Sequence, residues 1–282
     1  MANAGTESAA RVADVLLLFT DGPSPIGVSA ISRRLGLSKA VVHRILRTLV
    51  DHRLLVADPL TRGYQLGPAA AAIGARALRD SELRRVALPL LRRLQEATGE
   101  TTTLSAPVLR GRVYLAQVES FNEIKMTVEL GRRFPLHAGS SSRAILAFLA
   151  DEEREDVIAS GLVSLTGQTI VDPEQLRSSL EEVRRRGVAR SGGERQPGAG
   201  AVAGPVFGLD GAVVGAISVC GPVSRMTPQR CAELVPHVRA TAEAISVGLG
   251  WRGGLPDAEP GGGVGAEGAN RVAARSRWGS TA

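Results

Sequence analysis

Aromatic residues are scarce in this chain: Phe, Trp and Tyr together make up 3% of its 282 residues. Proteins that bind single-stranded nucleic acids stack bases on aromatic side chains, so this composition argues against an RNA or single-strand binder. Cysteine is also scarce, and Cys220 and Cys231 do not make a disulfide framework. The four histidines are scattered without metal-ligand spacing, so we expect neither a metal site nor a cofactor.

Long apolar runs are lacking as well. No stretch approaches the roughly 20 apolar residues of a membrane span, and the N-terminus lacks the basic and then apolar segments of a signal peptide. We therefore expect a cytoplasmic protein with no membrane partner. The sequence also lacks a Walker motif, a GxGxxG turn between a strand and a helix, and a GxSxG nucleophile motif. With no assembled catalytic constellation, we expect the protein not to be an enzyme.

Two short amphipathic helices joined by a glycine turn are the main feature of residues 24–66. Apolar residues repeat at helical spacing in both, and they are Val28, Ile31 and Leu35 in the first helix and Val42, Ile45, Leu46 and Leu49 in the second. Gly36 ends the first helix, and Ser38 can cap the second by accepting a backbone N–H. This arrangement is typical of a helix-turn-helix.

A basic outer face on the second helix predicts binding to double-stranded DNA. The residues on that face are Lys39, Ala40, Val41, His43, Arg44 and Arg47. The segments LLVADP and GYQLG then flank a short turn, which predicts a two-stranded wing with Arg62 at its tip. Most of the net charge of +6 lies in this part of the chain, where it favours a polyanion. The alternative is a charged face that is simply solvated.

The side chains on this face suggest different roles in DNA recognition. Arg44 and Arg47 can each pair bidentately with guanine O6 and N7. Ser38, Lys39 and Arg62 are expected to hold phosphates, and His43 suits either task. For Arg47 an ion pair with Asp51, one helical turn away, is the alternative.

The rest of the chain predicts helices followed by an antiparallel sheet, which is an α+β fold. A helix is expected at residues 11–19, and two connector helices are expected at residues 68–97. From residue 101 the periodicity changes from 3.6 to 2, with hairpin turns at Arg110-Gly111 and Asp210-Gly211. Further elements are a strand at residues 124–130, a helix at 142–149 and a closing helix from Thr227-Pro228 to about Gly248.

Three stretches together resemble the IclR family of bacterial transcriptional regulators. They are GLSKAVVHRILRTLVDHRLL with RGYQLG, FPLHAGSSSRAILAFL, and RRRGVARSGGERQPGAGAVAGPVFGLDGAVVGAISVCGP. The resemblance covers about residues 9 to 249 in order. It implies an N-terminal winged helix-turn-helix that dimerises and a GAF-like C-terminal domain that senses a small molecule.

The resulting domain prediction has five segments. They are a flexible N-terminus at residues 1–8, a winged helix-turn-helix DNA-binding domain at 9–67, connector helices at 68–97, a GAF-like effector-binding domain at 98–250 and a disordered Gly-rich tail at 251–282. Three departures from the family occur near the DNA. Ala40 and Val41 stand where the family often has Ser or Thr, and Val41 can instead touch a thymine methyl. Gly27 replaces the usual capping Ser or Thr, at a cost of only a few tenths of a kcal/mol.

For the effector, the resemblance points to a cup built from three places. Ser140 and Ser141 lie near the start of a helix, and Ser191 and Ala201 match pocket positions of the family. Ser218 and Cys220 alternate on the last strand and so face the same side. A pocket of hydroxyls suits a small organic acid or a neutral metabolite. Core filling is the alternative for Ser218 and Cys220.

We therefore expect a homodimer that binds a pseudo-palindromic operator and is modulated by a small-molecule effector. Whether dimers pair into tetramers, and whether the protein represses or activates, stays open at this stage. Two other classes remain. One is an architectural DNA binder with a vestigial sensor domain. The other is a small enzyme with an accessory DNA module, whose nucleophile would be Cys220 or the Ser140 cluster with His137.

Overall fold

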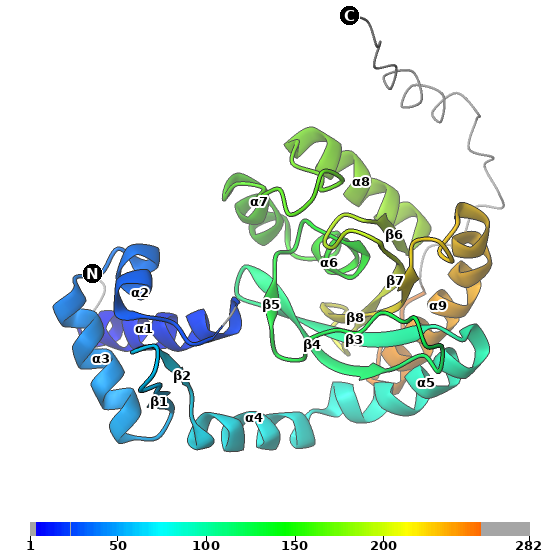
Figure 1. The fold of residues 1–282 in the computed structure, drawn as a ribbon. Coiled ribbons are helices and arrows are strands. Elements are labelled where there is room, and N and C mark those ends of the chain that lie inside the picture. The colour runs from blue at the N-terminus through cyan, green and yellow to red at the C-terminus, as the bar shows by residue number, and fades with distance from the viewer. Residues whose placement is uncertain (1–3, 23, 255–282) are drawn as a thin grey trace, which may run out of the picture.

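The computed structural model describes residues 4–22 and 24–254 and divides into two lobes (Figure 1). The N-terminal lobe (residues 4–67) is small and mainly helical, and the C-terminal lobe (residues 82–254) is larger and contains a curved sheet. Helix α4 (Pro68–Asp80) connects them. No helix among the described residues is both long and apolar enough to cross a membrane.

Three helices and a hairpin form the N-terminal lobe around one small core. They are α1 (Ala4–Leu17), extended by a 3₁₀ turn at Leu18–Thr20, then α2 (Val28–Leu35), α3 (Lys39–Asp51), β1 (Leu55–Ala57) and β2 (Tyr64–Leu66). The predicted turn is confirmed, because Gly36 ends α2 with a left-handed φ of 65°. The Ser38 hydroxyl caps α3, since it accepts the Val41 N–H at 3.3 Å.

The N-terminal boundary was predicted too late in the chain. Residues 4–8, expected to be flexible, form the first turns of α1, and the helix expected from Arg11 begins at Ala4. Alanines and Glu7 favour helix in this stretch. Arg11 also donates to Glu7 Oε1 at 2.5 Å across one helical turn, a pairing that favours helix.

The two connector helices differ in their surroundings. Helix α4 has no buried residue, and Ile73 on it is 63% exposed. Helix α5 (Glu82–Thr98) instead packs on the sheet through its buried residues Leu91 and Leu94. The Ser81 hydroxyl accepts the Arg84 N–H at 3.2 Å and so caps α5. Helix α4 is therefore mostly exposed, although its Ala69 N–H donates to the Arg53 carbonyl of the N-terminal lobe at 3.1 Å.

A six-stranded antiparallel sheet forms the centre of the C-terminal lobe and confirms the predicted α+β class. Its strands are β3 (Thr101–Val108), β4 (Gly111–Val118), β5 (Arg133–Phe134), β6 (Ala189–Gly192), β7 (Ala199–Phe207) and β8 (Val213–Pro222). They are ordered β5-β4-β3-β8-β7-β6 across the sheet. Both predicted hairpins are present, with Arg110 (φ 54°) and Gly211 (φ 80°) in the turns.

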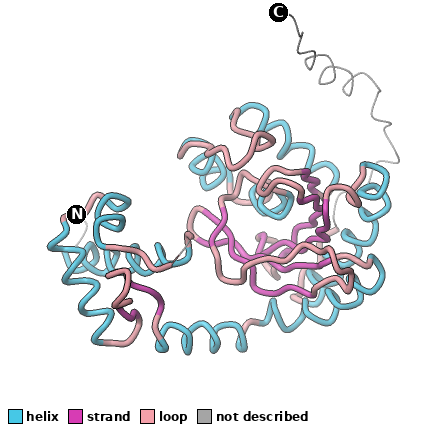
Figure 2. Tube along the Cα trace, viewed as in Figure 1, coloured by secondary structure: helices cyan, strands magenta, loops and turns pink. Residues whose placement is uncertain are grey.

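Helices cover both faces of this sheet (Figure 2). On one face α5 and α9 (Pro228–Gly248) pack against apolar residues such as Leu104, Val202 and Ile217. On the other face lie α6 (Ser140–Leu146), α7 (Asp151–Ala159) and α8 (Pro173–Arg186), which enclose a second apolar cluster. Helix α6 sits directly against the sheet, because all seven of its residues are buried.

Three other details differ from the sequence-based expectation. Residues 124–130, predicted as a strand, are a loop, and their Val128 N–H donates to the Gln117 side-chain oxygen at 2.9 Å instead of to a strand. Helix α6 begins at Ser140 rather than Ser142, because Gly139 (φ 89°) provides the turn before it. The tail was expected from residue 251, yet the Trp251 ring stacks on Phe207 at 4.9 Å between centroids. Residues 255–282 lie outside the described residues.

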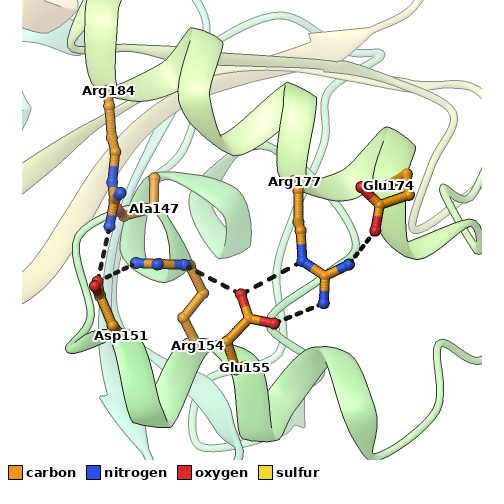
Figure 3. A network of polar contacts seen from close by, with 7 residues as sticks. All are labelled: Ala147, Asp151, Arg154, Glu155, Glu174, Arg177 and Arg184. Atoms are coloured by element: carbon orange, nitrogen blue, oxygen red, sulfur yellow. Dashed lines mark hydrogen bonds and ion pairs between the residues drawn. The ribbon is translucent and has the colours of Figure 1, made fainter.

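Ion pairs join α7 to α8 on the outside of the C-terminal lobe (Figure 3). Arg177 of α8 donates to Glu155 of α7 at 2.6 Å and also pairs with Glu174 on its own helix. Arg184 donates to the Ala147 carbonyl at 2.5 Å and lies 3.6 Å from Asp151. Asp151 and Glu155 of α7 are therefore paired with arginines of α8.

Candidate DNA interface and ligand pocket

The outer face of α3 and its N-cap residue carry seven of the eight predicted DNA-contacting residues. Six of them are exposed, namely Ser38, Lys39, Ala40, His43, Arg44 and Arg47. Val41 is half-buried. The opposite face of α3 packs into the core through Val42, Leu46 and Leu49. Since burial fixes the inner face, the basic face has a fixed orientation.

No residue in the described part of the chain neutralises the cations on this surface. Among the ion pairs of the described N-terminal residues, none includes Lys39, Arg44 or Arg47. The alternative of an Arg47–Asp51 ion pair is thus not formed in this structure. Unpaired guanidinium groups on an exposed helix keep their hydrogen-bond donors for a partner.

The wing holds Arg62 at its tip by local hydrogen bonds. The Asp58 carboxylate accepts the Leu60 N–H at 2.9 Å and the Thr61 hydroxyl at 2.6 Å. These hydrogen bonds lower the pKa of the Asp58 carboxyl below its usual range, and the bond from the Thr61 hydroxyl has the largest effect. Arg62 itself is exposed with a φ of 56°. A pair of backbone hydrogen bonds between Ile26 and Tyr64, 2.9 and 3.0 Å long, attaches the wing to the helices.

A small cavity lies on the α6 side of the sheet in the C-terminal lobe. The six residues predicted for an effector pocket all line it, and they are Ser140, Ser141, Ser191, Ala201, Ser218 and Cys220. Three of these form one row across the sheet, because Ala201 of β7 pairs with Ser191 of β6 and Cys220 of β8. The structure therefore brings together residues that are up to 80 positions apart in the sequence.

Sequence analysis missed several other residues that line this cavity. Arg112 and Tyr114 come from β4, Glu194 and Arg195 from the β6–β7 loop, and Met126 to Val128 from the loop predicted as a strand. The sequence does contain a signal for Arg112. It shares the strand face of Tyr114, and a charged residue on a buried strand face is rare unless it has a partner or a function.

Arg112 is buried against three hydroxyl groups. It is 1% exposed. Its Nε donates to Ser142 at 2.8 Å, its Nη1 to Ser105 at 2.9 Å and its Nη2 to the Tyr114 hydroxyl at 3.0 Å. Its guanidinium carbon lies 4.3 Å from the centre of the Tyr114 ring. Burial lowers the pKa of Arg112, yet arginine remains protonated in proteins.

The carboxylate beside the cavity belongs to Glu194 and is already paired. Its oxygens accept from Arg143 at 2.7 Å and from the Gly139 N–H at 3.1 Å. Burial raises the pKa of the Glu194 carboxyl, and Arg143 and Gly139 counteract that rise. The Arg143 guanidinium also donates to the Arg190 carbonyl, so this pair ties α6 to β6. Glu194 therefore offers little charge to a ligand.

The two groups considered as nucleophile and base are poorly suited to those roles. Burial raises the pKa of the Cys220 thiol to about 12, so the thiolate is not populated near neutral pH. The His137 ring is hydrogen-bonded through Nε2 to the Val163 carbonyl at 2.9 Å. Within residues 4–22 and 24–254, no cluster of three or more His, Cys, Asp or Glu side chains is placed to hold a metal ion.

Comparison with known proteins places both lobes in one family. The helix-turn-helix domain model of IclR matches residues 8–59, and the model of the bacterial transcriptional regulator IclR C-terminal domain matches residues 75–247. The transcriptional regulator BhcR of Paracoccus denitrificans is 34% identical over 251 residues, which are 88% of this chain and 89% of that protein. The transcriptional repressor AllR of Klebsiella pneumoniae is 33% identical over 252 residues, with coverage of 89% and 93%.

Solved structures show the same architecture. A crystal structure assigned to the IclR regulators, from Silicibacter sp. TM1040, superposes with a TM-score of 0.78 at 31% identity and covers 90% of this chain and 98% of its own. An IclR homologue from Microbacterium hydrocarbonoxydans, solved in complex with 4-hydroxybenzoate, gives a TM-score of 0.64 at 28% identity, with coverage of 86% and 98%. The winged helix-turn-helix, the C-terminal sensor lobe and the ordered matches along the sequence lead to one conclusion: this chain belongs to the IclR family of transcriptional regulators, with a DNA-binding N-terminal lobe and an effector-binding C-terminal lobe.

Proposed function

We propose that the protein reads a pseudo-palindromic operator as a homodimer and that a small organic acid in the C-terminal cavity modulates this binding. The observation that carries the proposal is the outer face of α3, where Lys39, Arg44 and Arg47 are exposed and form no ion pair with another described residue. A basic helix face held rigid by its buried side is suited to the major groove. The target is chromosomal, so we propose a cytoplasmic location.

Within this face, Arg44 and Arg47 are the proposed base-reading residues. Both are exposed, three positions apart, and so lie on the same side of α3. A guanidinium matches the O6 and N7 edge of guanine bidentately, and Val41 next to them suits a thymine methyl. We assign Ala40 to a position where the backbone of α3 lies close to the DNA.

Phosphate contacts are proposed for the remaining polar residues. Ser38 and Lys39 lie at the start of α3, Arg62 lies at the wing tip, and His43 can contact either a phosphate or a base. Such contacts fix the register of the protein on DNA without reading its sequence.

The dimer is proposed from exposed apolar surface. Helix α4 is Ala-rich and has no buried residue, and its Ile73 side chain is 63% exposed. A helix with so little packing of its own gains stability from a second copy of the chain. Two recognition helices held in this way would contact half-sites about one helical turn apart, or a multiple of that.

A small organic acid is the proposed effector because the cavity is lined by hydroxyl groups around the buried Arg112 cation. The related structure that contains 4-hydroxybenzoate supports an acid. Ser140, Ser141, Ser191, Ser218 and Cys220 would contact the ligand, and Ala201 would form part of the wall. We propose reversible binding without turnover, because the Cys220 thiol is un-ionised and His137 is engaged with a backbone carbonyl.

Repression is the proposed direction of regulation, since the similar protein AllR is named a repressor. An effector can change operator affinity only if it binds two conformations of the dimer with different affinities. We place that change in the relative position of the lobes, which α4 connects.

The test is selection of genomic fragments by the purified full-length protein at about 150 mM salt, where nonspecific binding is weak. Enrichment of one palindromic site supports the proposal, and the genes beside it indicate which metabolites to examine. Random recovery with a steep salt dependence would instead favour an architectural DNA binder. A candidate acid that is consumed during incubation would favour an enzyme.

A further inference from the structure

The geometry points to Arg112 as the specificity-determining residue of the C-terminal cavity: we propose that it binds the carboxylate of a small organic acid and excludes neutral analogues. This inference rests on the proposed effector role of the cavity. It adds the residue that selects for charge.

The guanidinium of Arg112 has hydrogen-bond donors to spare. A guanidinium carries five N–H groups, and three of its nitrogens donate to the hydroxyls of Ser142, Ser105 and Tyr114. One N–H on each terminal nitrogen has no protein acceptor among the described residues. Two donors on adjacent nitrogens are suited to a carboxylate.

No carboxylate in the described protein neutralises this cation. All three of its hydrogen-bond acceptors are neutral hydroxyls, although a buried charge is normally paired. Glu194 also lines the cavity, but its carboxylate is paired with Arg143. Arg195, which lines the cavity too, adds a second positive charge and lies over the Phe134 ring at 4.7 Å. The site therefore carries a net positive charge that an anion would compensate.

The hydroxyls around Arg112 are themselves held in place. The Ser142 hydroxyl accepts from Arg112 and donates to the Pro135 carbonyl at 2.8 Å. The Tyr114 ring packs edge-on against Phe134 at 5.5 Å between centroids. Because these contacts orient the guanidinium before any ligand arrives, binding costs little reorganisation.

The cavity is small. It leaves about 40 Å³ for the centres of water-sized atoms, and a single water needs about 10–15 Å³. Three to four such atoms fit, which is the size of a carboxylate with a short substituent. Met126 and Val128 lie on the loop that closes this space.

The first test uses matched pairs of probes on the full-length protein. Acetate and acetamide, propionate and propionamide, butyrate and butyramide, and benzoate and benzamide are titrated by calorimetry at constant ionic strength. Within each small pair we expect the acid to bind about 10- to 100-fold more tightly, because hydrogen bonds to a charged group contribute about 1.5–3 kcal/mol.

Variants of Arg112 test whether its positive charge causes the preference for acids. Arg112→Met should remove the preference for acid over amide, and Arg112→Lys should keep the preference with weaker affinity, since an ammonium lacks the planar fork. Arg185→Met is the matched control, because Arg185 is exposed, does not line the cavity and loses the same charge. If Arg112→Met fails to fold, the Arg112→Lys variant and the probe pairs on the unaltered protein still test whether Arg112 selects acids over amides.

Equal binding of acids and amides, or no binding of any small acid at about 50 mM, would overturn the proposal. These failures are distinguishable from failure of the proposed function. If a neutral metabolite shifts operator affinity, the cavity is an effector site without an anion-selecting Arg112. If acids bind through Arg112 but never alter operator affinity, the binding site stands and the regulatory role fails.

Discussion

An ion pair between the two lobes offers the sharpest test of how they communicate. Arg133 of β5 donates to Asp21 through Nε and Nη2, both at 2.5 Å, and the two side chains are 26% and 22% exposed. Asp21 lies just after the 3₁₀ turn that extends α1 in the N-terminal lobe. Figure 1 shows β5 on the side of the C-terminal lobe that faces the N-terminal lobe. The pair therefore stabilises this arrangement of the lobes.

The size of the effect follows from the geometry. Exposed ion pairs contribute about 0.2–1 kcal/mol, and partly buried bidentate arginine pairs lie at the upper end of that range. We take about 1 kcal/mol for Asp21 and Arg133, which corresponds to about a fivefold change in an equilibrium constant. Loss of the pair weakens the described arrangement relative to any arrangement in which the lobes separate.

Asp21→Asn should therefore change operator affinity about fivefold in protein without effector. Asp14→Asn is the control for net charge, because Asp14 is an exposed residue of α1 and forms no ion pair among the described residues. The assay is fluorescence anisotropy on the selected operator at fixed salt, with Asp21→Asn, Arg133→Gln and the double variant in one cycle. A coupling energy below about 0.3 kcal/mol, or an equal change in Asp14→Asn, would refute the reasoning.

Three further predictions follow from single side chains. Arg47→Ala should weaken operator binding by about 1–3 kcal/mol and relax one position of the site, measured by selection with the variant; uniform weakening over all sequences would reassign Arg47 to the backbone. Cys220 should resist iodoacetamide in the native protein at about pH 8 and react in urea, because a pKa of about 12 leaves about one thiolate in 10,000; rapid native labelling, read by mass spectrometry, would contradict the burial. Arg177 lowers the pKa of Glu155, so the stability from this pair is present above the usual glutamate pKa and is lost as pH falls through the lowered value. Glu155→Gln should thus have a lower urea midpoint than the unaltered protein at about pH 7 and the same midpoint at about pH 2, and a difference that persists in acid would argue against the ion pair.

Local patterns predicted the N-terminal lobe well. The turn at Gly36, the cap at Ser38 and the wing all depend on residues close together in the sequence, so spacing alone was enough. The start of α1 was missed because no apolar periodicity marks residues 4–8. Their helix rests on propensity and on the pair between Glu7 and Arg11, which periodicity does not detect.

The C-terminal lobe shows where such reasoning stops. Residues 124–130 alternate like a strand, but their backbone hydrogen-bonds to the Gln117 side chain and their side chains close the cavity. The local pattern does not show whether residues 124–130 pair with β4. In the structure β5 pairs with β4 instead, because tertiary packing places β5 there. Arg112 was overlooked for a related reason. Its three hydroxyl partners come from β3, β4 and α6, and only the folded sheet brings them together.

The cation that we assign to the ligand and the ion pair between the lobes are neighbours in the sheet. Phe134 of β5 pairs with Arg112 of β4, and its ring lies 5.4 Å from the Arg112 guanidinium. The residue that precedes Phe134 on β5 is Arg133. An acid bound to Arg112 would therefore act on the strand that holds Asp21. In Asp21→Asn we expect such an acid to bind through Arg112 but to lose most of its effect on operator affinity, because the contact that transmits it is gone. Calorimetry measures binding of the acid to Asp21→Asn. Fluorescence anisotropy with and without butyrate measures the effect of the acid on operator affinity. An unchanged butyrate effect in Asp21→Asn would show that the signal leaves the pocket by α4 instead.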